Sequence, residues 1–124
     1  MNGKTLTAEE ISLLRADAAR VFPQLAAEYA AKLGVTYNRV TVKLLKSRWG
    51  SCSEKGNLNF NILLMLAPES VQRYVVVHEL CHRIEMNHSK AFWANVAYLL
   101  PDYKRDAGWL KENGGNLLRR AGLY

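Results

Sequence analysis

All three histidines of this 124-residue chain fall within one stretch, HELCHRIEMNH, which runs from His78 to His88. His78 and His82 are four positions apart, so on a helix both imidazoles lie on one face and can reach the same cation. Glu79 follows the first histidine, where its carboxylate can reach a water on that cation without binding the metal itself. This HExxH pattern is typical of zinc hydrolases, in which the metal lowers the pKa of its water and the glutamate accepts the proton.

A catalytic zinc ion usually takes three protein ligands and leaves one position for water. His88 is the first candidate for the third ligand, but on a continuous helix it would point about 240° away from His82. The helix must therefore end before His88, and we expect Asn87, which tolerates the left-handed conformation, to make the reversal. The spacing matches that of metzincins, except that they carry a glycine where this chain has Glu85. A carboxylate from a later helix is the alternative third ligand. The downstream acidic candidates are Asp102, Asp106 and Glu112, and Glu85 is a nearer one.

The same stretch could also be an ordinary helix with two histidines. Buried imidazoles without a metal would each need a hydrogen-bond partner, which an otherwise apolar helix does not supply. The two cysteines, Cys52 and Cys81, form no CxxC pair, so we expect buried reduced thiols instead of a disulfide. Cys81 points in a different helical direction from the candidate ligands, which disfavours metal binding by its thiol.

The N-terminal part of the chain is predicted to be helical. Thr7 and Glu10 form a capping box at its start. Pro23 should kink the helix or split it. A second helical piece over about residues 24–33 would then end at Gly34, which suits the left-handed position after a helix.

Two strands are predicted next. Apolar and polar residues alternate over residues 40–44, which is the period of a half-buried strand. Residues 58–63 resemble a second strand, paired with the first as a hairpin. Asn59 and Asn61 would share the polar side of this second strand.

Three helices are predicted in the C-terminal half. The first runs from Pro68 to about Met86 and carries two of the candidate zinc ligands, His78 and His82. Ser89 is expected to cap the next helix, which Pro101 ends. Asp102 could cap a last helix that Gly114-Gly115 ends. The fold class is therefore α+β, with a small sheet that contains antiparallel pairing packed on helices.

The composition is that of one modest globular domain, with 49% hydrophobic and 23% charged residues. No apolar run is long enough to span a bilayer, and the N-terminus lacks the apolar core of a secretory signal. We therefore expect a cytoplasmic protein that does not enter a membrane. The net charge of +6 favours acidic partners, including nucleic acid, but only as a bias.

Three ordered stretches resemble the YgjP-like zinc metallopeptidases, a family related to the SprT-like and Spartan proteases. They are RWGSCSEKGNLNFN (48–61), YVVVHELCHRIEMNHSKAFW (74–93) and PDYKRDAGWL (101–110). The resemblance implies one Zn²⁺ ion held by His78, His82 and His88, with Glu79 as the general base. It also implies a gluzincin-like minimal metallopeptidase domain, in which the HExxH helix lies beneath a small sheet.

The resemblance divides the chain into three parts. Residues 35–112 match the family, residues 1–34 would be a helical lead-in, and residues 113–124 would be a C-terminal tail. Together they are expected to form a single metallopeptidase domain over residues 1–124.

The leading functional hypothesis is a zinc-dependent metallopeptidase that cleaves a peptide or protein substrate. A substrate strand could add to the edge of the sheet. The candidate substrate-binding residues are Arg48, Asn59, Asn61 and Tyr74. Tyr74, Arg48 and Tyr103 are also candidates to stabilise the oxyanion. A zinc-dependent amidase or other small-molecule hydrolase is one alternative, and a DNA-associated module with a mainly structural zinc is another. The sequence leaves the oligomeric state open.

Overall fold

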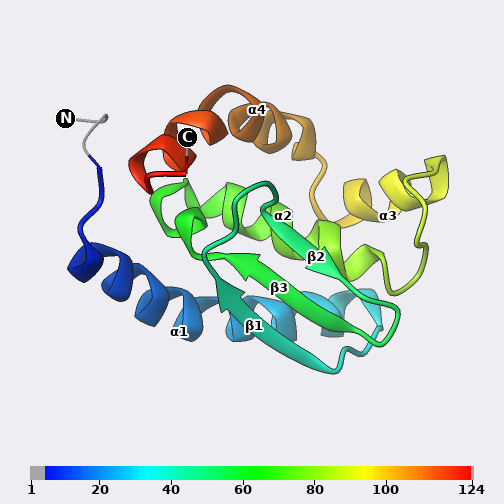
Figure 1. Ribbon diagram of the computed structural model, residues 1–124. Coiled ribbons are helices and arrows are strands. Elements are labelled where there is room, and N and C mark those ends of the chain that lie inside the picture. Colours follow the sequence, from blue (N-terminus) through cyan, green and yellow to red (C-terminus); the bar gives the residue numbers. More distant parts are fainter. Residues whose placement is uncertain (1–4, 124) are drawn as a thin grey trace.

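The computed structural model describes residues 5–123 and has an α+β fold. The elements are, in chain order, α1 (Ala8–Leu33), β1 (Arg39–Lys43), β2 (Gly50–Cys52), β3 (Asn57–Asn61), the 3₁₀ helix η1 (Ile62–Leu66), α2 (Glu69–Cys81), α3 (Lys90–Leu99) and α4 (Tyr103–Arg120). The sheet packs on α1 and α2, while α3 and α4 pack against α2 (Figure 1). The predicted fold class is therefore confirmed. Across the described residues, every helix is too short or too polar to cross a membrane.

The three-stranded sheet is mixed, with the strand order β1-β3-β2. β2 and β3 form an antiparallel hairpin whose turn uses Gly56 at a φ of 85°. β1 pairs with β3 in parallel. The predicted hairpin between residues 40–44 and 58–63 is therefore wrong. The short strand β2, which is too brief to show an alternating pattern, takes the antiparallel position beside β3, so the chain must cross over between β1 and β2.

Asn61 holds this crossover in place. Its side chain is fully buried, and its Nδ2 donates to the carbonyl oxygens of Leu45 at 2.9 Å and Arg48 at 3.1 Å. Its Oδ1 accepts a hydrogen bond from the backbone N–H of Leu63 at 3.0 Å, which starts η1 where the predicted strand was expected to continue. Asn61 therefore fixes the loop that leads into β2, and its amide faces backbone groups of the chain itself.

Helix α1 is continuous through Pro23, so of the two predicted outcomes, a kink or a split, the split into two helices is wrong. Phe22, directly before the proline, is fully buried and stacks on Phe60 of β3 with a centroid distance of 4.9 Å. Tertiary packing of this face outweighs the one backbone hydrogen bond that a proline removes. The capping box of Thr7 and Glu10 is confirmed at the N-terminus of the helix.

Helix α4 passes through Gly114 and Gly115 and ends at Arg120, beyond the predicted stop. Residues 113–120 are therefore helical and do not form a tail. Gly114 is needed for close packing, because a Cβ there would lie 2.7 Å from Cζ2 of Trp49. Asp102 occupies the N-cap position, but its side chain makes no capping hydrogen bond.

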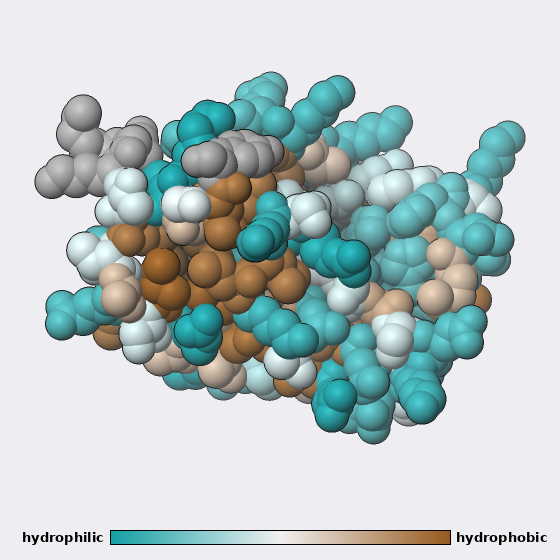
Figure 2. All heavy atoms as spheres, in the orientation of Figure 1, coloured by the Kyte–Doolittle hydropathy of each residue, from teal (hydrophilic) through white to brown (hydrophobic). Residues whose placement is uncertain are grey.

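A second, smaller apolar cluster anchors the end of α4 to the start of the described chain. Leu6, Leu63 and Leu118 are its buried members, and the backbone N–H of Leu6 donates to the carbonyl of Arg120 at 2.6 Å. Figure 2 shows apolar side chains gathered on the surface of the molecule in the region where α1 begins and α4 ends. This cluster explains why α4 extends past its two glycines, since burial compensates for their low helix propensity.

Candidate metal centre and active-site cleft

Helix α2 carries the first four residues of the HExxH motif, His78 to Cys81. The helix begins after Pro68 and ends at Cys81, with His82 as its C-cap residue, so the predicted end near Met86 is too late. Its sides are covered by the sheet, α1, α3 and α4. His78 is half-buried and Glu79 is 6% exposed. A buried helix of this kind holds its side chains in a fixed position, which suits a reactive site.

The chain leaves α2 early enough to bring His88 back towards the other histidines. The backbone N–H groups of His82, Arg83 and Ile84 each bond to a carbonyl three residues earlier, so a tight turn follows the helix. The predicted left-handed reversal at Asn87 is wrong, because no residue other than glycine has a positive φ within residues 5–123. Since the helix has already ended, the intervening residues turn the chain with ordinary backbone angles.

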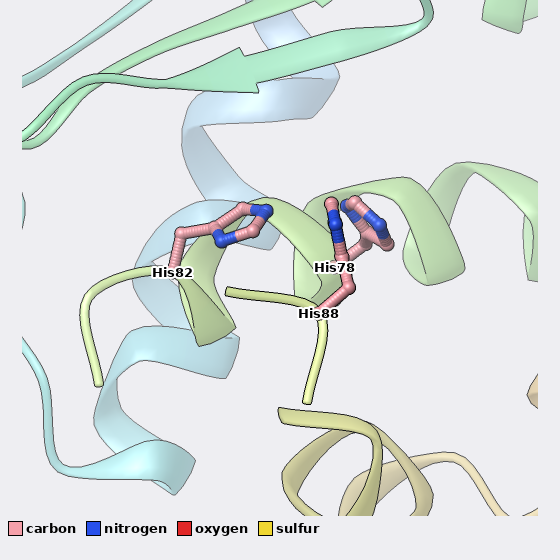
Figure 3. Close-up of side chains that lie close together, drawn as sticks. All are labelled: His78, His82 and His88. Atoms are coloured by element: carbon pink, nitrogen blue, oxygen red, sulfur yellow. The ribbon is translucent and has the colours of Figure 1, made fainter. Parts of the chain in front are cut away.

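The structure brings His78, His82 and His88 together. Their possible ligand nitrogens all lie within 4.8 Å of one another. Figure 3 shows His78 on α2, His82 at the C-terminal end of this helix and His88 on the loop before α3. The pKa of His88 is lowered, mainly by burial and then by the two neighbouring imidazoles. A lowered pKa favours the neutral ring, which is the form that binds metals.

The acidic alternatives for the third ligand lie outside this group. Asp106 is buried and accepts a hydrogen bond from Ser70 Oγ at 2.8 Å. Asp102 and Glu112 are exposed. Among the side chains that the structure describes, the three histidines are the only cluster of three or more histidine, cysteine or acidic groups with metal-binding proximity.

The ring of Phe92 packs against all three imidazoles. This residue of α3 is fully buried, and its ring centroid lies 5.1 Å from that of His78, 4.6 Å from that of His82 and 4.8 Å from that of His88. Ser89 caps α3 as predicted, because its side chain accepts a hydrogen bond from the Phe92 N–H at 3.3 Å. The cap therefore starts α3 directly after His88 and places Phe92 in its first turn. The signal for Phe92 in the sequence is an aromatic residue one helical turn beyond His88.

The donor set fits a zinc ion. Nδ1 of His82 lies 3.2 Å from the carbonyl oxygen of Glu85, and donation to that oxygen leaves Nε2 free to bind a metal. With Zn–N bonds of about 2.1 Å, tetrahedral ligand nitrogens are roughly 3.4 Å apart. The separations of up to 4.8 Å therefore need to close by at most about 1.4 Å, which small rotations of side chains can supply.

Glu79 lies between α2 and β2, next to the histidines. Its Oε2 is 2.9 Å from Nδ1 of His78. Gly50 of β2 makes this position possible, because a Cβ there would lie 3.0 Å from Cγ of Glu79. The sequence did not predict this contact between Gly50 and Glu79. The feature of the sequence that could have indicated this contact is a glycine directly after Trp49, where a strand begins.

Two cavities meet at Glu79. An open groove of about 290 Å³ contains the three histidines and is bordered by β2 and Arg48. A second cavity of about 390 Å³ lies between α2 and α4. Both are lined in part by Gly50, His78 and Glu79, so Glu79 borders both cavities.

The structure places the four candidate substrate-binding residues in different surroundings. Arg48 is exposed and borders the histidine groove. Tyr74 lines the second cavity. Asn59 lines neither cavity, and its amide donates to Ser51 Oγ at 3.2 Å. Asn61 is buried in the crossover, where its contacts support a structural role instead of a substrate contact.

A row of stacked aromatic rings connects Tyr74 to the histidines. Its ring stacks on Tyr103 at 6.4 Å, Tyr103 stacks on Trp93 at 5.2 Å, and Trp93 stacks on His88 at 5.9 Å. Burial, and then the charge of Glu79, raise the pKa of Tyr74 to about 12. The phenol therefore keeps its proton at neutral pH and can donate a hydrogen bond.

The cysteines do not take part in the histidine cluster. Cys81 is fully buried, as predicted, and burial raises the pKa of its thiol to about 12. Cys52 is half-buried on the border of the groove, and both cysteines are free thiols. A protonated thiol is a poor zinc ligand, which agrees with the prediction that Cys81 does not bind the metal.

Two solved structures share the fold: the metallopeptidase zymogens abylysin of Pyrococcus abyssi and jannalysin of Methanocaldococcus jannaschii. Abylysin is 22% identical with a TM-score of 0.66, over 74% of this chain and 94% of that one. Jannalysin is 21% identical with a TM-score of 0.62, over 76% of this chain and 95% of that one. A comparison with curated protein sequences gives no significant match.

The family model for the YgjP-like metallopeptidase domain matches residues 3–113. The chain therefore belongs to the YgjP-like family, whose domain is that of a metal-dependent peptidase. The match begins well before residue 35, so α1 is part of the family domain and the likeness is wider than the predicted range of 35–112.

Proposed function

We propose that this chain is a zinc-dependent peptidase, in which His78, His82 and His88 hold one zinc ion and Glu79 is the general base. The observation that carries the proposal is the convergence of three imidazoles beside a buried carboxylate at an open groove. Three nitrogen ligands leave a fourth position open, as in catalytic sites, whereas structural zinc sites usually have four protein ligands. When bound, zinc lowers the pKa of a water molecule and polarises the scissile carbonyl.

Glu79 accepts the proton of the attacking water and delivers it to the leaving amine. Glu79 packs between α2 and Gly50, which limits the movement of its carboxylate. A fixed carboxylate suits this role, because it must meet first the attacking water and then the leaving amine. Tyr74 is the preferred oxyanion stabiliser, since it lines the same cavity as Glu79 and stays protonated. Tyr103 and Arg48 are the alternatives.

The substrate is a peptide segment in extended conformation. β2 is an edge strand of the sheet, and its residues Gly50, Ser51 and Cys52 border the groove that contains the histidines. An added strand would pair with this edge and pass the three rings. Arg48, at the border of the same groove, would bind a carbonyl or carboxylate of the substrate.

The experiment is the substitution Glu79→Gln, with Glu112→Gln as a matched control at an exposed position of α4. Cleavage of an unfolded protein and zinc content are measured on the same samples. We expect Glu79→Gln to lose about 10²- to 10⁴-fold in kcat with one zinc ion still bound, because the ligand set is intact. The control should match the wild type in both measurements. Undiminished cleavage by Glu79→Gln would reject this mechanism.

A panel of small amides, assayed beside the unfolded protein, separates the peptidase from an amidase. Turnover of small amides with no peptide cleavage would favour the amidase. Retention of zinc with no hydrolysis of either class would favour a structural zinc.

A further inference from the structure

We infer that the cavity between α2 and α4 is a subsite for one bulky apolar side chain of the substrate, and that it selects the bond to be cleaved. The inference rests on the proposed peptidase function and names the substrates that this function would favour. The cavity shares Gly50, His78 and Glu79 with the histidine groove. A peptide that lies in the groove with its scissile bond at Glu79 therefore has one neighbouring side chain at the mouth of the cavity.

The walls of the cavity are chiefly apolar. Trp49, Tyr74, Val75, Ala107 and Leu110 line it. Besides the histidine and glutamate of the site, the one charged residue in the lining is Lys111, which is exposed. A charged substrate side chain would lose its hydration in this cavity without gaining a buried partner of opposite charge, which is unfavourable. Burial of a leucine, phenylalanine or tryptophan side chain is favourable, because it removes apolar surface from water.

The size of the cavity fits one large side chain. Its volume of about 390 Å³ lies at the lower end of the range for small-molecule sites. Two of the aromatic side chains that line the cavity pack against residues that do not line it. The Trp49 ring packs on Gly114, where a Cβ would lie only 2.7 Å from it, and the Tyr74 ring stacks on Tyr103 at 6.4 Å. Walls held in this way keep their shape, so the cavity can discriminate among side chains by size.

The wall on α4 offers positions for changing that size. Ala107 and Leu110 are three residues apart and lie on one face of the helix, towards the cavity. Ala107→Phe would place a ring in the cavity, and Leu110→Ala would widen it. Lys104→Phe is the matched control, because it adds the same ring at an exposed position of the same helix that does not line the cavity.

The test is a digest of a mixed peptide library, with every cleavage site identified by mass spectrometry. For the wild type and for Lys104→Phe, we expect bulky apolar residues at one position beside the cut to be favoured about 10-fold or more over glycine and aspartate. Ala107→Phe should lose about 10-fold or more in kcat/KM for these peptides while it still cleaves peptides with alanine at that position. Leu110→Ala should shift the preference towards tryptophan. Cleavage without any preference, or an unchanged preference in both cavity variants, would overturn the subsite.

A binding measurement separates failure of the subsite from failure of the proposed peptidase. N-acetyl-L-phenylalaninamide is titrated into the wild-type protein, and the NMR signals of the Ala107 and Leu110 methyl groups and the Trp49 indole are followed. We expect these signals to shift saturably, and N-acetyl-L-aspartamide to leave them in place. Saturable shifts in a protein that cleaves no peptide would reject the peptidase and support an apolar binding site. Absence of shifts with phenylalaninamide would overturn the subsite, whether or not peptides are cleaved.

Discussion

Replacing Gly50 with alanine tests how closely β2 must approach α2. A Cβ at this position would lie 3.0 Å from Cγ of Glu79, 3.1 Å from Cγ1 of Val75 and 3.2 Å from the backbone oxygen of Asn59. All three distances are shorter than the 3.4 Å at which ordinary van der Waals contact begins. Two of these neighbours belong to α2 and the third to the paired strand β3, so the methyl group would press on both elements.

The distances set the size of the expected effect. Relief of the contacts requires a shift of about 0.4 Å at Glu79 and about 0.2 Å at Asn59. Overpacking of this kind costs about 1–3 kcal/mol of stability. A misplacement of about 1 Å in an active site can lower the rate roughly 100-fold, so on a logarithmic scale the shift at Glu79 corresponds to a roughly 5- to 10-fold loss.

The assay measures kcat for peptide cleavage, zinc content and the midpoint of urea denaturation. We expect Gly50→Ala to lower kcat roughly 5- to 10-fold and the free energy of unfolding by about 1–3 kcal/mol, with one zinc ion per chain retained. Zinc should stay, because the new methyl group meets Glu79 and none of the histidines. Gly108→Ala is the matched control: its Cβ would meet nothing within 4 Å, and it should stabilise α4 by about 0.5–1 kcal/mol with kcat unchanged.

Wild-type kcat and stability in Gly50→Ala would refute the reasoning, because β2 and Glu79 would then adapt without cost. A joint fall of kcat and zinc content would also contradict it, since the perturbation would have reached the metal ligands.

Three further predictions concern packing, capping and the metal. Gly114→Ala should lower the free energy of unfolding by about 1–3 kcal/mol in urea denaturation, because its Cβ would lie 2.7 Å from the Trp49 ring. Ser89→Ala should lower it by about 1 kcal/mol in the same assay, because the capping hydrogen bond to Phe92 is lost. Removing the metal with a chelator should leave the far-UV circular dichroism in place but speed amide hydrogen exchange around His88, which the metal would tie to α2.

Each of these outcomes can fail in a recognisable way. Unchanged stability in Gly114→Ala would mean that Trp49 moves aside at no cost, and unchanged stability in Ser89→Ala would mean that water replaces the cap. Loss of the helical signal on chelation would show that the whole fold depends on the metal. For the two substitutions, Ser12→Ala on the exposed side of α1 serves as the control.

The features that the sequence predicted correctly depend on residues close together in the chain. His78 and His82 lie one helical turn apart, so their common face follows from the geometry of α2 alone. The capping box at Thr7 and the cap at Ser89 each join a side chain to a backbone N–H three residues away. The α+β class also followed, because the two periods of apolar residues are local signals.

The predictions that were wrong depend on contacts between distant residues. The parallel pairing of β1 with β3 requires the crossover that Asn61 holds, and no periodicity in residues 40–63 reveals it. Helix α1 continues through Pro23 because Phe22 packs on the sheet, and α4 continues through Gly114 because Trp49 needs that space.

The candidate site shows the same division. The sequence by itself determined which residue types could bind a metal and accept a proton, because these follow from side-chain chemistry and helical spacing. Only the tertiary structure decided how His88 returns, that Phe92 lies beneath the rings, and that a glycine of β2 admits Glu79 to the junction of two cavities. The physical reason is that these positions are set by the packing of α2 against β2, α3 and α4, which no local pattern in the sequence specifies.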